Sequence, residues 1–157
     1  MTNTPALHTY LDIDLISVQS DVSSRKKLLQ NMARMLSVPL PQKNKEKDVY
    51  HLLLEREKLG NTGVGNGVAL PHSRCGQAHK AIIAIITLSE AIDYESLDRQ
   101  PVDVAFGLLV PKEATQEHLN LLADIARMMS NDERKAQLVA AKTSTQVIEL
   151  VASWANE

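Results

Sequence analysis

The sequence predicts a single α/β domain in which helices cover both faces of a mixed β-sheet. Residues 80–88 form a continuous aliphatic run and residues 102–110 alternate in polarity, as is typical of strands in a buried sheet. Segments with apolar residues three and four positions apart surround these two strands and indicate amphipathic helices. No repeat, linker or low-complexity stretch divides the 157 residues, so we assign residues 10–157 to one domain and residues 1–9 to a flexible tail.

The first elements expected are an extended segment and a helix. Residues 11–18 alternate imperfectly and are predicted to form a first strand or an extended edge. A helix is expected to start at Ser23 or Ser24, both favourable N-cap residues, and to end near Ser37, where prolines follow. Its buried face is predicted to contain Leu28, Leu29, Met32, Met35 and Leu36.

A second helix is predicted for residues 46–59, with Gly60 as the residue that ends it. Its buried face is expected to contain Val49, Leu52 and Leu53. Arg56 is the next position on that face, so its side chain is predicted to point inward at the helix end. Two interpretations stay open: Arg56 reaches a surface acid such as Glu57, or it serves a site beside the segment that follows.

Three further helices are predicted in the C-terminal part of the chain. Thr115 is the expected N-cap of the first, which places His118 in its opening turn. The buried face of this helix is predicted to contain Leu119, Leu122, Ala126 and Met129. Shorter amphipathic helices are expected over residues 131–142 and 143–154, and the polar residues 89–100 are predicted to form a turn region.

Composition excludes several classes of function. The net charge of −2 and the five aromatic residues (one Trp, one Phe, three Tyr) argue against nucleic acid as a partner. The single cysteine, Cys75, cannot form an internal disulfide, which favours a reducing compartment. The N-terminus has no apolar core of a secretory signal, and the longest apolar run, 81–86, is too short to cross a bilayer. We therefore predict a cytoplasmic protein without membrane insertion.

Residues 60–74 are the most informative segment for function. Four of the six glycines lie here, namely Gly60, Gly63, Gly65 and Gly67. Glycine-rich backbone can present its N–H groups to an anion. Pro71 stiffens the chain that presents His72, and a hydroxyl and a cation follow at Ser73 and Arg74. Two interpretations stay open, a phosphate-binding segment or a tight hairpin between two short strands.

The familiar motifs for nucleotides, metals and hydrolases are not matched. A P-loop requires Lys and a hydroxyl residue where Asn66 and Gly67 stand, and the dinucleotide motif requires glycine at Val68. A zinc site needs three or four ligands, whereas only His72, His118 and Cys75 are suitably placed. No GxSxG motif of a serine hydrolase is present. We therefore predict no metal and no cofactor.

Phosphoryl transfer to a histidine fits these residues better. It needs a neutral imidazole as nucleophile and fixed positive charge around the transferred group, and it needs no general base. His72 would be the nucleophile, His118 would donate a hydrogen bond, and Arg56 would supply charge. Further contacts to phosphate are predicted from Thr62, Gly63, Gly65, Asn66, Gly67 and Ser73.

Residues 56–59, 60–69 and Pro71-His72 resemble the active-site motif of the mannitol/fructose/nitrogen-type enzyme IIA domains of the bacterial phosphoenolpyruvate phosphotransferase system. Glu117-His118-Leu119 resembles the second histidine motif of that family, and the likeness extends from about residue 10 to residue 153. The resemblance implies that His72 is phosphorylated, that His118 is its neighbour in the site and that Arg56 lies near the phosphoryl group. It also implies a mixed sheet sandwiched by helices.

The resemblance also implies partners. A free-standing IIA domain without IIB or IIC segments is most similar to the nitrogen-regulatory branch, with an HPr-like carrier (NPr) as donor and a regulatory protein as target. A fructose- or mannitol-type IIA that passes phosphate to a separate IIB component, and a binding module that transfers nothing, are the alternatives. Ser73 stands where the family more often has glycine, a difference that bears on docking and leaves the nucleophile intact. The sequence leaves a weak homodimer open.

Overall fold

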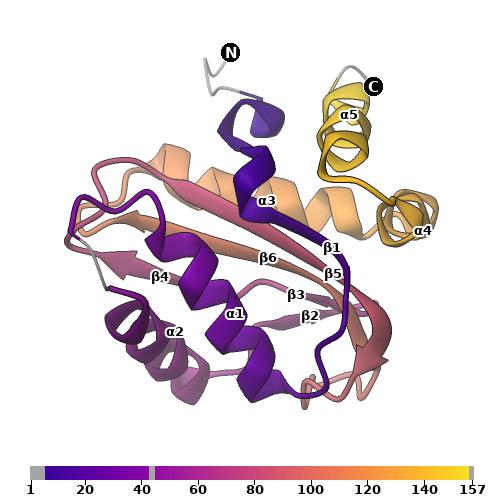
Figure 1. Cartoon of the computed structure of the whole chain (residues 1–157), viewed down its shortest axis with the longest axis horizontal. Coiled ribbons are helices and arrows are strands. Elements are labelled where there is room, and N and C mark those ends of the chain that lie inside the picture. The colour runs from indigo at the N-terminus through magenta and orange to yellow at the C-terminus, as the bar shows by residue number, and fades with distance from the viewer. Residues whose placement is uncertain (1–5, 43–44, 156–157) are drawn as a thin grey trace.

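A mixed sheet with strand order β1-β5-β6-β3-β2 is the centre of the fold in the computed structural model, and β4 pairs with β6 beside β3 (Figure 1). The structure describes residues 6–42 and 45–155. β1 is parallel to β5, β5 is antiparallel to β6, and β3 and β4 are both parallel to β6. The strands are β1 (Ile16–Ser20), β2 (Gly63–Gly65), β3 (Val68–Ala69), β4 (His72–Cys75), β5 (Ile82–Ile92) and β6 (Val102–Pro111).

Helices cover both faces of this sheet, as the sequence predicts. Figure 1 shows α1 crossing the sheet on the side nearer the viewer, with α3 behind the strands. The helices are α1 (Arg25–Ser37), α2 (Glu46–Leu59), α3 (Gln116–Met129), α4 (Asp132–Ala140) and α5 (Ser144–Trp154), with short 3₁₀ turns at Leu7–Tyr10 and Ile13–Leu15. Among the described residues, no helix is long and apolar enough to cross a membrane.

The two faces of β5 explain why its first five residues, 82–86, are all apolar. Ile82, Ala84 and Ile86 pack into the core beneath α1 and α2. Ile83 and Ile85 alternate with them and pack into a second core beneath α3, α4 and α5. Because successive side chains of a strand point to opposite faces, a strand covered on both sides carries apolar residues at every position. The predicted doubly buried strand is therefore confirmed.

Capping residues determine where α1 and α5 begin. Ser24 accepts a hydrogen bond from the Lys27 N–H at 3.1 Å, so α1 begins as predicted, and Thr143 caps α5 in the same way. The first strand starts later than predicted, at Ile16, because the Asp12 side chain accepts a hydrogen bond from the Asp14 N–H and supports a 3₁₀ turn there. Residues 1–5 of the predicted tail lie outside the described residues.

The buried face of α3 differs from the prediction. Its core residues are Leu121, Ile125, Met128 and Met129. Of the four positions predicted, Met129 alone is buried, and 49% of Leu119 is exposed. The apolar surface of the helix is wider than predicted: its centre faces the core one position away from the predicted face, while Leu122 and Ala126 are partly buried and pack at the edge of the core. The edge with Leu119 and Leu122 lines the cavity described below.

Gly107 of β6 gives the fold a close contact that can be tested. A Cβ atom there would collide with the side chain of Met32 and lie 3.1 Å from Cδ1 of Leu36, both fully buried in α1. We expect Gly107→Ala to lower the free energy of unfolding by about 1–3 kcal/mol through overpacking. Gly76→Ala is the matched control, because nothing lies within 4 Å of its Cβ position. Urea denaturation of both variants checks this, and equal stabilities would contradict it.

Candidate functional site

A cavity of about 490 Å³ lies where the end of α2, the strand β4 and the start of α3 meet. It brings together the three residues for which the sequence predicts catalysis: Arg56 from α2, His72 from β4 and His118 from α3. Arg74 and Ser73 of β4 also line it. The remaining wall is mostly apolar and is formed by Leu52, Leu59, Leu108, Val110, Ala114, Leu119 and Leu122, with Glu55 at the edge.

The interruption between β3 and β4 positions His72. Both strands run along the same side of β6, with Ala69 opposite Ala105 and His72 opposite Leu108. Pro71 lies between them, and its carbonyl accepts a hydrogen bond from the Leu108 N–H at 3.0 Å. Proline has no N–H to donate and restricts its own backbone, so His72 starts a new strand from a stiff support.

The hydrogen bond of His72 decides which of its ring nitrogens keeps a free lone pair. Nδ1 lies 2.5 Å from the carbonyl oxygen of Leu70. A carbonyl only accepts hydrogen bonds, so in the neutral ring Nδ1 carries the hydrogen and Nε2 keeps its lone pair. Burial lowers the pKa of His72 below its usual value; the Leu70 carbonyl opposes this shift and the charge of Arg56 adds to it. The ring is therefore neutral, with Nε2 available, at neutral pH.

His118 has the opposite arrangement. It lies in the first turn of α3, and its Nδ1 accepts a hydrogen bond from the backbone N–H of Thr115 at 3.1 Å. Because Nδ1 is the acceptor, the hydrogen of the neutral ring sits on Nε2. The two imidazoles thus offer the cavity complementary groups: a lone pair from His72 and an N–H donor from His118.

Two arginines border the same cavity, and backbone carbonyls hold both. Arg56 donates to the Gly60 carbonyl at 2.8 Å, and Arg74 donates to the Lys112 carbonyl at 3.0 Å. A guanidinium has five N–H donors, so each arginine keeps others for an anion. Arg74 was not among the predicted site residues, although alternation along β4 puts it two positions from His72 on the same side of the strand.

The glycine-rich segment forms a hairpin, which was the alternative interpretation. β2 and β3 pair antiparallel around the turn at Asn66, where Gly65, Asn66 and Gly67 have positive φ angles. The Asn66 N–H donates to the Asp98 carboxylate at 3.0 Å. These glycines permit a turn that other residues would strain.

The hairpin does not reach the His72 cavity. Gly67 pairs with the start of β6, where its carbonyl accepts from the N–H groups of Asp103 and Val104, whereas His72 pairs with Leu108 farther along that strand. The N–H of Gly63 donates to the Asn61 side chain at 2.7 Å, and that of Thr62 donates to Glu57. Of the six predicted phosphate contacts, Ser73 is the one that lines the cavity.

Glu57 is the important residue near the site that sequence reasoning missed. Its side chain is 2% exposed and pairs with Arg25 at 3.1 Å. The burial of Glu57 could have been inferred from the sequence, because it follows the buried Val49 and Leu53 at intervals of four residues. A surface pair with Arg56 was one of the two interpretations left open for this stretch, whereas Arg56 bonds to Gly60.

Comparison with known proteins identifies the family. The sequence model described as "Phosphoenolpyruvate-dependent sugar phosphotransferase system, EIIA 2" matches residues 9–154. The nitrogen regulatory protein of Pseudomonas aeruginosa is 38% identical over 133 residues, which cover 85% of this chain and 86% of that protein.

Solved structures agree with this result. The crystal structure of the nitrogen regulatory protein IIA-Ntr from Neisseria meningitidis superposes with a TM-score of 0.86 at 32% identity, and the match covers 92% of this chain and 98% of that one. Enzyme IIA for mannitol from Escherichia coli, solved in complex with phosphorylated enzyme IIB, shares the fold at 15% identity with a TM-score of 0.74 (coverage 91% and 97%). The chain therefore belongs to the EIIA type 2 family of the phosphoenolpyruvate-dependent phosphotransferase system.

Proposed function

We propose that this chain is a phosphocarrier in which Nε2 of His72 accepts a phosphoryl group from the phosphohistidine of an HPr-like carrier. The observation that carries the proposal is the hydrogen bond between Nδ1 of His72 and the Leu70 carbonyl, which leaves Nε2 as the reactive nitrogen. Two arginines and His118 line the same cavity as His72. Membership of the EIIA family supports a role in phosphoryl transfer.

The transfer needs no proton to move. The Nε2 lone pair of His72 forms the new N–P bond while the P–N bond of the donor breaks, and its electron pair returns to the donor's ring nitrogen. The hydrogen on Nδ1 stays between the ring and the Leu70 carbonyl throughout. This carbonyl stabilises the positive charge that the ring gains as Nε2 is phosphorylated.

The surrounding groups stabilise the charge on the phosphoryl oxygens. Arg56 and Arg74 supply permanent positive charge, and Nε2–H of His118 and the hydroxyl of Ser73 are the available neutral donors. Catalysis of phosphoryl transfer consists mainly of positioning and electrostatic stabilisation, and this set of groups provides both.

The cavity rim is suited to docking a partner protein. Leu59 is 85% exposed and Leu119 is 49% exposed, so apolar side chains flank the opening that the donor histidine must approach. We assign the chain to the nitrogen-regulatory branch, with an NPr-type donor and a regulatory target controlled by phosphorylation state. The identity of 38% with a nitrogen regulatory protein, against 25% with a fructose-specific EIIA component, favours this branch over transfer to a IIB sugar-transport component.

Intact-mass spectrometry tests the function. The protein is incubated with phosphoenolpyruvate, enzyme I and an HPr-type carrier, and in parallel with the nitrogen-type enzyme I and NPr. We expect one added phosphoryl group, acquired faster from NPr, and no transfer onward to a fructose- or mannitol-type IIB. No uptake from either carrier, while a control acceptor is labelled, would contradict the proposal; onward transfer to IIB would place the chain in the sugar-transport branch.

The lowered pKa of His72 predicts how uptake depends on pH. Because the neutral ring is the nucleophile, a pKa below the usual value of about 6.5 keeps His72 reactive to lower pH than an exposed histidine. We expect the His72 ring signals in an NMR titration to have a midpoint below pH 6.5. The rate of phosphoryl uptake should fall at acidic pH with the same midpoint. Arg56→Ala should move this midpoint upward, since Arg56 disfavours the imidazolium. A midpoint above 6.5 in the unaltered protein would contradict the prediction.

A further inference from the structure

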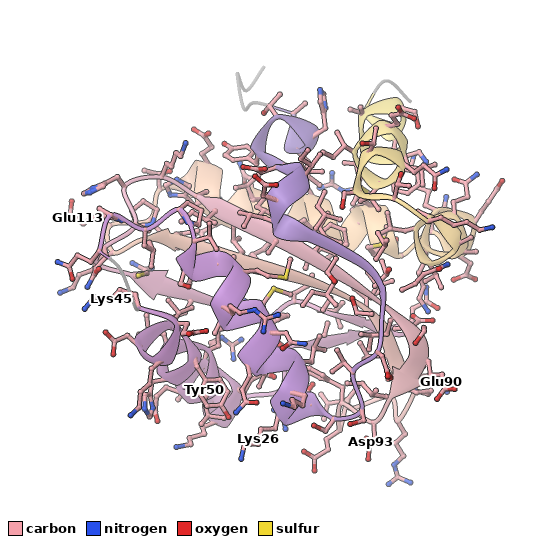
Figure 2. The ribbon with its side chains drawn as sticks, viewed as in Figure 1. Lys26, Lys45, Tyr50, Glu90, Asp93 and Glu113 are labelled. Carbon is pink, nitrogen blue, oxygen red and sulfur yellow. The ribbon has the colours of Figure 1, made fainter. Side chains whose placement is uncertain are left out.

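Glu57 is a buried carboxylate next to the site but outside its cavity. It lies in the last turn of α2, where the partial negative charge of the helix end disfavours an acid. It does not line the His72 cavity; it borders a separate depression between α1 and α2. Lys26 and Tyr50, labelled in Figure 2, come from these two helices and line the same depression. Burying a carboxylate here costs free energy unless a cation and hydrogen-bond donors compensate for the lost water.

Three donors converge on this carboxylate. The guanidinium of Arg25 donates at 3.1 Å, the N–H of Thr62 at 3.1 Å, and the Thr62 hydroxyl at 2.5 Å. Burial and the charge of Glu57 raise the pKa of Tyr94, so its phenol stays protonated and donates to the Thr62 oxygen 3.1 Å away. Glu57 thus holds both the backbone and the side chain of Thr62.

A continuous path of hydrogen bonds runs from Thr62 to His72. The carbonyl of Thr62 accepts from the N–H of Leu70 at 2.9 Å. The carbonyl of the same Leu70 residue accepts from Nδ1 of His72 at 2.5 Å. The residue that orients the imidazole is therefore itself anchored, through one backbone hydrogen bond, to the residue that Glu57 holds.

We propose that Glu57 is a positioning residue for phosphoryl transfer: by holding Thr62 it fixes Leu70, and Leu70 fixes the orientation and tautomer of His72. Hydrogen-bonded partners behind a reactive histidine set its tautomer in many sites, and their loss costs activity although they never touch the substrate. The kinetic consequence rests on the proposed function, whereas the tautomer of His72 can be measured without it.

Glu57→Gln is the decisive variant. The amide has nearly the same shape, but it has one acceptor oxygen for three donors and no charge for Arg25. We expect ¹⁵N-edited NMR of the His72 ring to change from the single Nδ1–H tautomer to a mixture of both. Phosphoryl uptake at saturating carrier should fall about 10- to 100-fold. KM for the carrier should change less than about twofold, because the rim residues Leu59 and Leu119 are untouched.

Glu95→Gln is the matched control. Glu95 is the second acid that pairs with Arg25, at 2.8 Å, but its side chain is 70% exposed, and the carboxylate that holds Thr62 is that of Glu57. This variant should keep the tautomer and the uptake rate. Thr62→Val is the second test variant in case Glu57→Gln fails to fold, since it removes the hydroxyl bond to Glu57 and keeps the backbone N–H. It should shift the tautomer in the same direction.

The outcomes separate the two proposals. An unchanged His72 tautomer in folded Glu57→Gln overturns the positioning role, even if stability or uptake falls, because the residue is then merely structural. The same holds for Thr62→Val if it has to replace that variant. If the unaltered protein takes up no phosphoryl group, the proposed function fails, and the NMR comparison still decides whether Glu57 sets the tautomer.

Discussion

Replacing His72 with alanine is expected to reduce phosphoryl uptake from the carrier to below about a thousandth of its normal rate. The variant lacks the Nε2 lone pair, and His118, whose Nδ1 accepts from Thr115, presents an N–H rather than a lone pair to the cavity. Intact-mass spectrometry after incubation with phosphorylated carrier measures this directly.

His79→Ala is the control for this experiment, because that imidazole is exposed and lies outside the cavity. It should take up phosphate at the normal rate. Circular dichroism should show that His72→Ala keeps its fold, since the side chain is only half-buried at the start of β4. Acid-labile phosphate on a folded His72→Ala protein would show that another residue is the acceptor.

Replacing Arg56 with alanine is expected to lower the uptake rate about 10²- to 10³-fold, the usual loss when one preorganised charge-stabilising donor is removed. The effect should appear at saturating carrier, because the proposed mechanism gives Arg56 a contact to the transferred group and little part in binding the carrier. Arg56→Lys should recover part of the rate, since it restores the charge without the planar fork that lets Arg56 hold Gly60 and an anion together.

Lys58→Ala is the matched control for Arg56. Lys58 is a cation in the same helical turn, but it pairs with Glu55 and is 62% exposed, outside the cavity. Its removal should leave uptake within about twofold of normal, because exposed ion pairs contribute little. Equal losses in the two variants would mean that only the overall charge of the surface matters, and would contradict the role given to Arg56.

The architecture could be predicted from the sequence because its signals are local. The side chains of Ser24 and Thr143 cap the helices that begin after them, and residues 82–86 of β5 are all apolar because helices cover both faces of the strand there. The side of α3 that packs into the core could not be predicted. Leu119 and Leu122 look like core residues, but the fold places them at a cavity, and periodicity alone does not distinguish an apolar core from an apolar rim.

The site was predictable to a similar degree. Arg56, His72 and His118 stand out by residue type and local context, and the structure brings them to one cavity. The glycine segment was predicted to contact phosphate and forms a hairpin instead. Glycines that permit a hairpin and glycines that bind phosphate look alike in sequence. The position of Glu57 on the buried face of α2 could be read from its spacing, but its cation, Arg25, is 32 positions away in the chain, so no local pattern reveals that the buried charge has a partner.

The most direct test is to identify the phosphorylated atom. The ¹⁵N-histidine-labelled protein is phosphorylated through phosphoenolpyruvate, enzyme I and the carrier, and the ring nitrogens are then observed by NMR. We predict that His72 carries phosphorus on Nε2 and keeps its hydrogen on Nδ1, against Leu70. Phosphorus on Nδ1 of His72 or on His118, or no phosphohistidine while a control acceptor is labelled, would contradict it.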